Sequence, residues 1–393
     1  MICFDFEHSM RGMKAAKVRS SNAMAATIKE ALLTKGSFRH FIDTYIERGF
    51  DAAEHVDLMN KVHQIQRAGG VFITLSPSTV GVALRAVLDP LGTNSPEMMF
   101  LGDSLSADSV YRVLEALHGR STYLYVIADD LKVPEIGANF RVLRQWFEAQ
   151  YGRAETEKRI FVASPPGSDL HRLAEVHHYD HYALDADFPK EYIAYHPVAY
   201  LPFLVAGVDL KEFFNGARMS MHELATETTN PLMDYVIIRW LAFQEGIEVE
   251  SVCTFEPKLE SFCEWRARLR GNDMIYHGHA LFLRDLDSLK YYHARYKNKI
   301  METFINVKVP TIDIVVRPDQ SYEDGLGHLD NISFNELNNI ACDEIIARHR
   351  AEGMMINEVQ CRRLSAVNMG SLTFFFIAAG ILVCAMIEKE EKA

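Results

Sequence analysis

The feature that most constrains this chain is a regular alternation of short apolar runs and amphipathic segments. Runs rich in β-branched and aromatic residues occur at 71–75, 98–102, 122–128 and 159–164, and each is followed by residues with helical spacing. Strands that alternate with helices of this length indicate βαβ units, and therefore a parallel sheet covered on both faces. Such sheets bind ligands beyond the carboxyl ends of their strands, so the loops that follow the strands are where chemistry is expected.

The alternation does not fill the whole sequence. Its 393 residues are enough for two domains. The first 60 residues have helical spacing, and a second α/β pattern includes a strand that ends just before Glu256-Pro257 and apolar runs at 301–309 and 311–317. We predict an α/β fold with an N-terminal helical segment over 1–60, a first domain over 61–205 and a second domain over 206–387.

Charge and cysteine content exclude some classes of protein. The formal net charge is −12, which argues against nucleic acid as a partner because phosphate binding depends on clustered Lys and Arg. The six cysteines include no CxxC pair, so a disulfide scaffold and a structural zinc site are not expected. We predict a cytoplasmic protein that needs no cofactor and no metal.

The C-terminal region contains an uncharged stretch from Leu364 to Ile387. Its length would allow it to span a bilayer. However, the stretch opens with polar and small residues, among them Ser365, Asn368 and Gly370. We therefore predict a buried terminal helix and no membrane association.

Two loops after predicted strands carry residues that bear on phosphate binding. Ser76-Pro77-Ser78-Thr79 offers hydroxyls at the start of a helix, where they either bind a phosphate or cap the helix. Asp129-Asp130-Leu131-Lys132 follows the third strand. Two carboxylates at about 5 Å from a phosphate, with an effective dielectric of about 20, would each cost a few kcal/mol. The sequence also lacks a Walker A or GxGxxG motif in a strand-to-helix turn.

Clustered histidines are candidate metal ligands. His171, His177, His178 and His181 lie near Asp180, and imidazole with carboxylate suits zinc or nickel. Their spacing matches no compact metal template, and the same holds for the pair in Tyr276-His277-Gly278-His279. Both segments are interpreted as polar loops.

A series of motifs in the second half of the chain follows the order found in a known family. Phe255-Glu256-Pro257, Glu264-Trp265 and Gly271 lie in the best-matching segment, where the family has Y-E-P, F-x-E-W and L-x-G. The sequence thereby resembles the Firmicute type of glucose-6-phosphate isomerase from about residue 40 onward. The resemblance implies two SIS (sugar isomerase) domains of flavodoxin-like topology. Further matching residues are Gly216-Ala217, Asn230-Pro231, Tyr235, Arg239, Asp285-Leu286, Ser288-Leu289 and Glu302-Thr303.

The resemblance also implies that the catalytic positions are substituted. The family moves a proton between C1 and C2 with the Glu of a G-E-S motif, but here Asn272 occupies that position, and it cannot accept a proton. Asp273 lies one position along. Asp287 replaces the ring-opening His of D-L-H-S, and Glu191 replaces an Arg that stabilises negative charge. Arg268 stands where the family has a Gln.

The phosphate-binding positions are altered as well. The family's G-G-S turn becomes Ser76-Pro77-Ser78, which keeps only Ser78. Its S-K-x-G-T-T loop becomes residues 128–133, which lose the hydroxyls and carry Asp129, Asp130 and Lys132. The family's terminal catalytic lysine has no counterpart before Ala393, so the resemblance implies a shortened C-terminus.

Three hypotheses about function follow. The first is a family member with lost or altered isomerase activity, which binds a sugar or sugar phosphate without ordinary turnover. The second is a working glycolytic isomerase that uses Asp273 or Asp287 as base and Arg268 or Lys190 as the cation. The third is a regulatory subunit of an active isomerase. The resemblance implies a dimer, either of two copies of this chain or with a paralogue.

Overall fold

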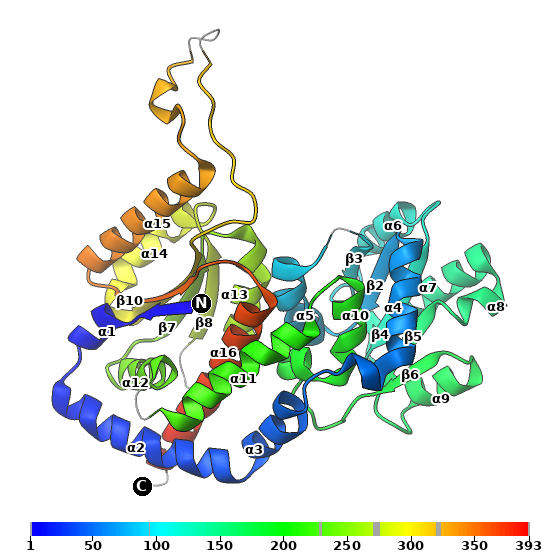
Figure 1. The fold of residues 1–393 in the computed structure, drawn as a ribbon, viewed down its shortest axis with the longest axis horizontal. Helices are drawn as coiled ribbons and strands as arrows, with labels where there is room; N and C mark the ends of the chain where they lie inside the picture. The colour runs from blue at the N-terminus through cyan, green and yellow to red at the C-terminus, as the bar shows by residue number, and fades with distance from the viewer. Residues whose placement is uncertain (1, 94, 228–229, 270–275, 320–323, 392–393) are drawn as a thin grey trace. The chain divides into compact units, whose positions relative to one another are not determined.

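The computed structural model describes residues 2–93, 95–227, 230–269, 276–319 and 324–391 (Figure 1). The chain divides into two compact units. We call residues 44–214 the central unit, and residues 1–43 together with 215–393 the split unit. Each unit is built on one five-stranded sheet.

The sheet of the central unit is wholly parallel, with strand order β3-β2-β4-β5-β6. In chain order this is 2-1-3-4-5, the flavodoxin-like arrangement that the resemblance implied. The predicted strand at 71–75 is β2, residue for residue. The strands are β2 (Val71–Leu75), β3 (Glu97–Leu101), β4 (Thr122–Ile127), β5 (Ile160–Ser164) and β6 (Asp180–Ala183).

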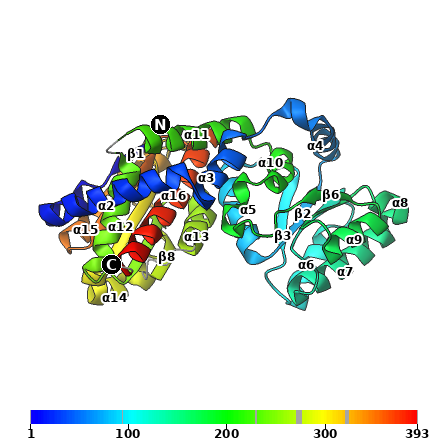
Figure 2. The same cartoon turned by 90° about the horizontal axis from the view of Figure 1, so that it is seen from below.

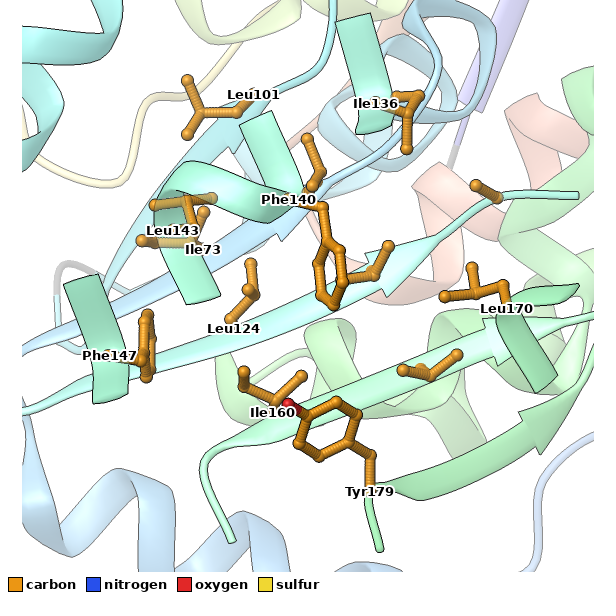
Figure 3. Close-up of a cluster of buried hydrophobic side chains, with 14 of the residues drawn as sticks. Ile73, Leu101, Leu124, Ile136, Phe140, Leu143, Phe147, Ile160, Leu170 and Tyr179 are labelled. Carbon is orange, nitrogen blue, oxygen red and sulfur yellow. The ribbon is translucent and has the colours of Figure 1, made fainter. Parts of the chain in front are cut away.

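Helices cover both faces of this sheet (Figure 2). On one face α7 contributes Ile136, Phe140, Leu143 and Phe147 to a hydrophobic core against Leu124 and other strand residues (Figure 3). On the other face the hydroxyl of Tyr125 donates to the carbonyl of Val198 at 2.9 Å. The helices are η1 (Ile42–Glu47), η2 (Ala52–His55), α4 (Val56–Ala68), α5 (Ser78–Leu91), α6 (Ala107–Ala116), α7 (Pro134–Tyr151), α8 (Arg153–Thr156), α9 (Asp169–Val176), η3 (Lys190–Tyr195), η4 (Pro197–Ala199) and α10 (Tyr200–Val205).

The sheet of the split unit has the order β1-β10-β9-β7-β8. Only β1 is antiparallel to its neighbour; the other pairs are parallel. The strands are β1 (Ile2–Asp5), β7 (Val249–Thr254), β8 (Tyr276–Leu281), β9 (Ile300–Val307) and β10 (Met355–Cys361). The helices are α1 (Glu7–Arg11), α2 (Ala15–Thr34), α3 (Ser37–Phe41), α11 (Leu210–Thr226), α12 (Pro231–Gln244), η5 (Pro257–Leu259), α13 (Glu260–Arg268), α14 (Leu286–Tyr296), η6 (Lys297–Lys299), η7 (Gly327–Leu329), α15 (Phe334–Ala351) and α16 (Ala366–Glu391).

Helix α16 corresponds to the uncharged C-terminal stretch. By length and composition alone it could cross a membrane, but 72% of its most apolar window is buried within the protein. It packs against α12 and α2 (Figure 1). Helix α11 also approaches it closely, because a Cβ at Gly216 would lie 1.8 Å from the carbonyl oxygen of Val367. The stretch is therefore a core helix in this fold, as predicted.

Several expected elements differ in the structure. Residues 2–5 form an edge strand, although helices were expected throughout the first 60 residues. Residues 180–183 and 276–281, interpreted as polar loops, are β6 and β8. Residues 311–317 form no strand of the sheet and make one isolated bridge, Val315 with Ser333. Polar side chains occur in the edge strands: β6 has no fully buried residue, and in β8 only Ala280 and Leu281 are buried.

Candidate functional site

The topological switch point of the central unit lies between β2 and β4. These strands are neighbours, and the chain leaves them in opposite directions, toward β3 and toward β5. Ligands of doubly wound sheets bind in the crevice that opens at such a point, beyond the carboxyl ends of the strands. The loop after β2 (76–77) and the loop after β4 (128–133) therefore frame the candidate site.

The loop after β2 presents a buried hydroxyl and a helix N-terminus. Ser76 is buried, and its Oγ has no hydrogen-bond partner among the described residues. Gly81 in α5 lies close to this hydroxyl: a Cβ at position 81 would be only 3.3 Å from the Ser76 oxygen. Helix α5 begins at Ser78, and its N-cap residue Pro77 supplies no side-chain cap. An uncapped helix N-terminus favours an anion or another acceptor group.

The loop after β4 carries carboxylates, which disfavour an anion. Asp129 is exposed, and its Oδ1 lies 3.0 Å from the Nζ of Lys190, the first residue of η3. The same Nζ donates to the carbonyl oxygens of Asp185 and Ala186 at 3.4 and 3.5 Å. Helix η3 packs against α5. The ammonium group of Lys190 is thus engaged by Asp129 and two carbonyls.

The other charges of this loop are also paired internally. Asp130 Oδ1 accepts a hydrogen bond from its own loop, from the backbone N–H of Lys132, at 2.6 Å. The Nζ of Lys132 lies 3.3 Å from Asp169, which also pairs with Arg172. These hydrogen bonds and the two basic partners hold the pKa of Asp169 below its usual value. The predicted residues Asp129, Asp130 and Lys132 therefore bond to protein groups in this structure.

A third group of side chains follows β6. The hydroxyl of Tyr45 donates to the carboxylate of Asp185, and His196 Nε2 lies 3.3 Å from Asp185 Oδ2. Burial lowers the pKa of His196 to about 4, more than the neighbouring carboxylate raises it. His196 is consequently neutral at pH 7, and its Nδ1 accepts a hydrogen bond from Val198 N–H at 3.2 Å. Neither Tyr45 nor His196 was predicted, and Tyr45 lies 140 positions from Asp185 along the chain.

The remaining predicted residues lie on η3, on elements of the split unit, or outside the described residues. Glu191 is half-buried in η3. In the split unit, Asp287 is exposed in the first turn of α14, and Arg268 donates to Glu264 at 2.5 Å within α13. Asn272 and Asp273 lie outside the described residues. The predicted site residues that the structure describes therefore come from separate elements of both units.

The split unit has its own switch point, between β7 and β9. A cavity of about 310 Å³ opens where these two strands end. Glu256 and Lys258 line it from the segment after β7, and Thr311 from the segment after β9. Glu256 Oε1 caps η5 by accepting from Lys258 N–H at 3.1 Å. This cavity was not predicted, although Glu256 belongs to the matching motif.

Residues that carried the resemblance meet in a buried ionic cluster of the split unit. Glu250 on β7 accepts from Arg239 at 3.0 Å and from Arg266 at 2.8 Å, and also from Tyr235 and Thr303. Burial alone would raise the pKa of Glu250, but the guanidinium groups of Arg266 and Arg239 hold it well below its usual range. Tyr235, Arg239 and Thr303 thus match the family at positions that build the core.

The histidine-rich segment of the central unit does not gather into a metal site among the described residues. The rings of His171 and His181 stack 4.1 Å apart, whereas His177 stacks on Tyr179. His181 Nε2 lies 3.0 Å from Ser164 Oγ. In the described part of the chain, a group of three suitable ligands occurs instead at His293, Glu302 and His349.

Comparison with known sequences finds distant relatives of this chain. No family model matches it. The glucose-6-phosphate isomerase of Staphylococcus saprophyticus is 27% identical over 375 residues, which cover 92% of this chain and 83% of that enzyme. That of Caldanaerobacter subterraneus is 26% identical over 351 residues, covering 84% and 78%. This chain is a distant homologue of Firmicute glucose-6-phosphate isomerases.

Solved structures agree on the fold. A hypothetical protein from Thermus thermophilus matches with a TM-score of 0.79 and 15% identity over 98% of this chain and 94% of that one. A glucose-6-phosphate isomerase from Chlamydia trachomatis matches with a TM-score of 0.68 and 13% identity over 92% and 73%. At such identities the likeness concerns the fold alone. It confirms the predicted pair of mainly parallel sheets covered by helices.

Proposed function

We propose that this chain is a homologue of glucose-6-phosphate isomerase with lost or altered isomerase activity, which binds a sugar or sugar derivative rather than a phosphosugar. The observation that carries the proposal is the ion pair between Asp129 and Lys190, 3.0 Å long, in the loop where the resemblance implies phosphate binding. A phosphate there would meet the carboxylates of Asp129 and Asp130. It would also have to displace the carboxylate of Asp129 from the ammonium group of Lys190.

The ligand site that we propose is the crevice at the carboxyl ends of β2 and β4. The start of α5, whose N-cap residue Pro77 gives no side-chain cap, and the Oγ of Ser76, which has no partner among the described residues, supply hydrogen-bonding groups. The carboxylates of the opposite loop supply acceptors. Sugar hydroxyls are both donors and acceptors, so they suit this mixed lining better than a dianion does.

The substitutions at the family's catalytic positions support loss of turnover. Asn272 in place of the general base removes a group whose contribution is typically about 10²–10⁴-fold in rate. Arg268 is bonded to Glu264, and Lys190 to Asp129, so both cations of the rewired-isomerase hypothesis are already neutralised. Asp287 is exposed in α14 and is the candidate base of that alternative that lies among the described residues.

The first test is conversion of fructose 6-phosphate to glucose 6-phosphate by the purified chain. We expect a rate at least about 10²-fold below that of a Firmicute isomerase assayed beside it. An ordinary enzyme rate would overturn the proposal and favour the rewired isomerase; the variant Asp287→Asn would then be expected to lose that rate. If an active isomerase copurifies with the chain, the regulatory-subunit hypothesis gains support.

The second test separates sugar from phosphosugar binding by calorimetry with fructose and fructose 6-phosphate. Asp129→Asn should free the ammonium of Lys190 and strengthen fructose 6-phosphate binding by roughly tenfold, since one favourable charge contact is worth about 1 kcal/mol or more. Asp187→Asn removes the same charge from an exposed position nearby and is the matched control. If wild type binds fructose 6-phosphate more tightly than fructose, the proposed ligand class is wrong.

A further inference from the structure

Two histidines and a glutamate converge in the core of the split unit. They come from three elements: His293 from α14, Glu302 from β9 and His349 from the last turn of α15. One ligand atom of each lies within 4.8 Å of the others. His349 Nδ1 is 2.6 Å from Glu302 Oε2, and His293 Nε2 is 3.5 Å from Glu302 Oε1. The three side chains thus surround one point on the face of β9 that α14 and α15 cover.

The charge of this group is not balanced by a permanent cation. Glu302 is fully buried, and the basic groups within 4 Å of its carboxylate, over the part of the chain that the structure describes, are the two imidazoles. Glu250 on the adjacent strand shows the alternative solution, since two arginines neutralise it. A buried carboxylate is costly unless a cation or hydrogen bonds compensate it, and Glu302 Oε1 accepts no hydrogen bond from any described residue.

The residue types and the closed surroundings fit one kind of ligand. Imidazole nitrogen with carboxylate oxygen is a ligand set that zinc and its neighbours in the first transition series accept. His293 and His349 are 4% and 3% exposed, and the cluster borders an apolar core that includes Phe282 and Phe304. A site so far from solvent is not accessible to a substrate. A ligand bound there would have a structural role.

We propose that His293, Glu302 and His349 bind a divalent transition-metal ion of the zinc type, which fastens α14 and α15 to β9. His349 binds the ion through Nδ1, so its imidazole then carries the proton on Nε2. With zinc–nitrogen and zinc–oxygen distances of about 2.0–2.2 Å, the ligand atoms of a tetrahedral ion lie about 3.3–3.6 Å apart. His293 Nε2 and Glu302 Oε1 are already 3.5 Å apart, whereas His349 Nδ1 and Glu302 Oε2, now 2.6 Å apart, have to separate by several tenths of an ångström. The proposal concerns stability of the split unit and is independent of the ligand proposed for the central unit.

The test uses the full chain, stripped with a chelator and titrated with Zn²⁺ and Co²⁺. We expect one ion per chain after dialysis and a rise in melting temperature with metal concentration, because an ion bound only by the folded state stabilises it. His293→Asn and His349→Asn should each weaken binding by more than the roughly 10–100-fold that loss of an outer-shell partner costs. His118→Asn, an exposed histidine of the central unit, is the matched control and should bind like wild type.

A measurement on the unmutated chain guards against variants that fail to fold. Zn²⁺ should slow amide hydrogen exchange in α14, β9 and α15, while β2, β4 and β5 of the central unit should not respond. If no ion is retained, the proposal is wrong. It is equally wrong if retained Zn²⁺ protects only the segment that carries His171 and His181, or if His181→Asn removes the binding.

Discussion

At the scale of single residues, the buried ions of the split unit explain why so distant a sequence keeps recognisable motifs. Tyr235 and Arg239 are both buried and both bond to Glu250. Once a carboxylate and two guanidinium groups are buried together, no one of them can change without leaving an uncompensated charge. Motifs of this kind therefore identify the fold, and they say little about whether the catalytic chemistry persists.

This reasoning predicts a large effect of Glu250→Gln. The change keeps the shape but leaves Arg239 and Arg266 without their counter-ion, so we expect the free energy of unfolding of the split unit to fall by about 3–5 kcal/mol. Glu248→Gln is the control; it removes an exposed glutamate that pairs with Lys299, and should change stability by less than about 1 kcal/mol. Urea unfolding followed by hydrogen exchange over β7 and β9 would measure both. Equal effects would show that the cluster is not ionic.

His196 makes the central unit sensitive to acid. Burial lowers the pKa of His196 from 6.5 to about 4. Between pH 4 and pH 6.5 this imidazole is therefore protonated in the unfolded state and neutral in the folded state. The free energy of unfolding is therefore unaffected by His196 above about pH 6.5 and decreases as the pH falls toward 4. The loss is about 2–3 kcal/mol at pH 4.5. Asp185, Tyr45 and Lys190 are the titratable groups around it.

The variant His196→Asn tests this pH dependence. Asn retains an acceptor for the N–H of Val198 but does not titrate, so the urea midpoint of the central unit should depend less on pH between 4.5 and 7. His118→Asn should leave the wild-type dependence in place. A dependence unchanged in His196→Asn would assign the acid sensitivity to another group.

The candidate site could be predicted only in part from the sequence. Ser78, Asp129 and Lys132 were found because they follow predicted strands, and chain order alone brings those loops to one edge. The pairing of Asp129 with Lys190 joins residues 61 positions apart and depends on how η3 folds back on α5. His293, Glu302 and His349 are likewise separated by long stretches, and no spacing template exists for ligands that three different elements bring together.

At the scale of elements, the success of the fold prediction depended on burial. Strands β2, β4 and β5 are buried at every position, so their sequences are continuous apolar runs that stand out between amphipathic helices. β6 and β8 lie at sheet edges and contain Asp, His and Gly, which are poor strand formers taken singly. Their strand structure comes from a neighbouring strand that supplies the hydrogen bonds. Sequence pattern alone does not reveal such a neighbour.

Helix α16 is the element for which the sequence offered two readings, and the structure agrees with the predicted buried helix. Its side chains pack against α12 and α13: the ring of Phe375 lies 5.5 Å from that of Tyr235, and the ring of Phe376 lies 5.9 Å from that of Phe262. The guanidinium of Arg266 lies 5.3 Å from the Phe376 ring. A helix surrounded by lipid would not make such contacts with α12 and α13. We therefore expect α16 to contribute to the stability of the split unit as a core helix does.

Phe376→Ala tests that contribution. Truncating a fully packed phenylalanine should destabilise the split unit by about 3–5 kcal/mol through lost burial and a residual cavity. Ile381→Ala on the same helix, at a half-buried position, should cost clearly less. Chemical unfolding in buffer without detergent would measure both values. A Phe376→Ala protein as stable as Ile381→Ala would contradict the packing described here.

At the scale of the whole molecule, the split unit is assembled from segments at both ends of the chain. Residues 2–5 pair with 358–361 as the edge strand of the sheet. Ser9 Oγ donates to the carbonyl of Ile356 at 2.9 Å, and the ring of Phe4 stacks on Phe375 at 4.7 Å. Helix α2 covers α12 and α16. The central unit, by contrast, is one continuous stretch with its own core.

This arrangement predicts that the two units respond differently to removal of residues 1–43. Without them, β10 becomes an open edge, and the apolar faces of α12 and α16 that α2 covers meet water. Hydrogen exchange should therefore accelerate strongly over β10, α12 and α16, whereas β2, β4 and β5 should keep their protection. Lys17→Ala, which removes only the exposed pair of Lys17 with Glu245 between the same parts of the split unit, should leave both units protected. If the shortened chain keeps full protection over α12 and α16, the N-terminal segment is dispensable to the split unit; if β2 and β4 lose theirs as well, the central unit depends on it and does not hold its fold alone.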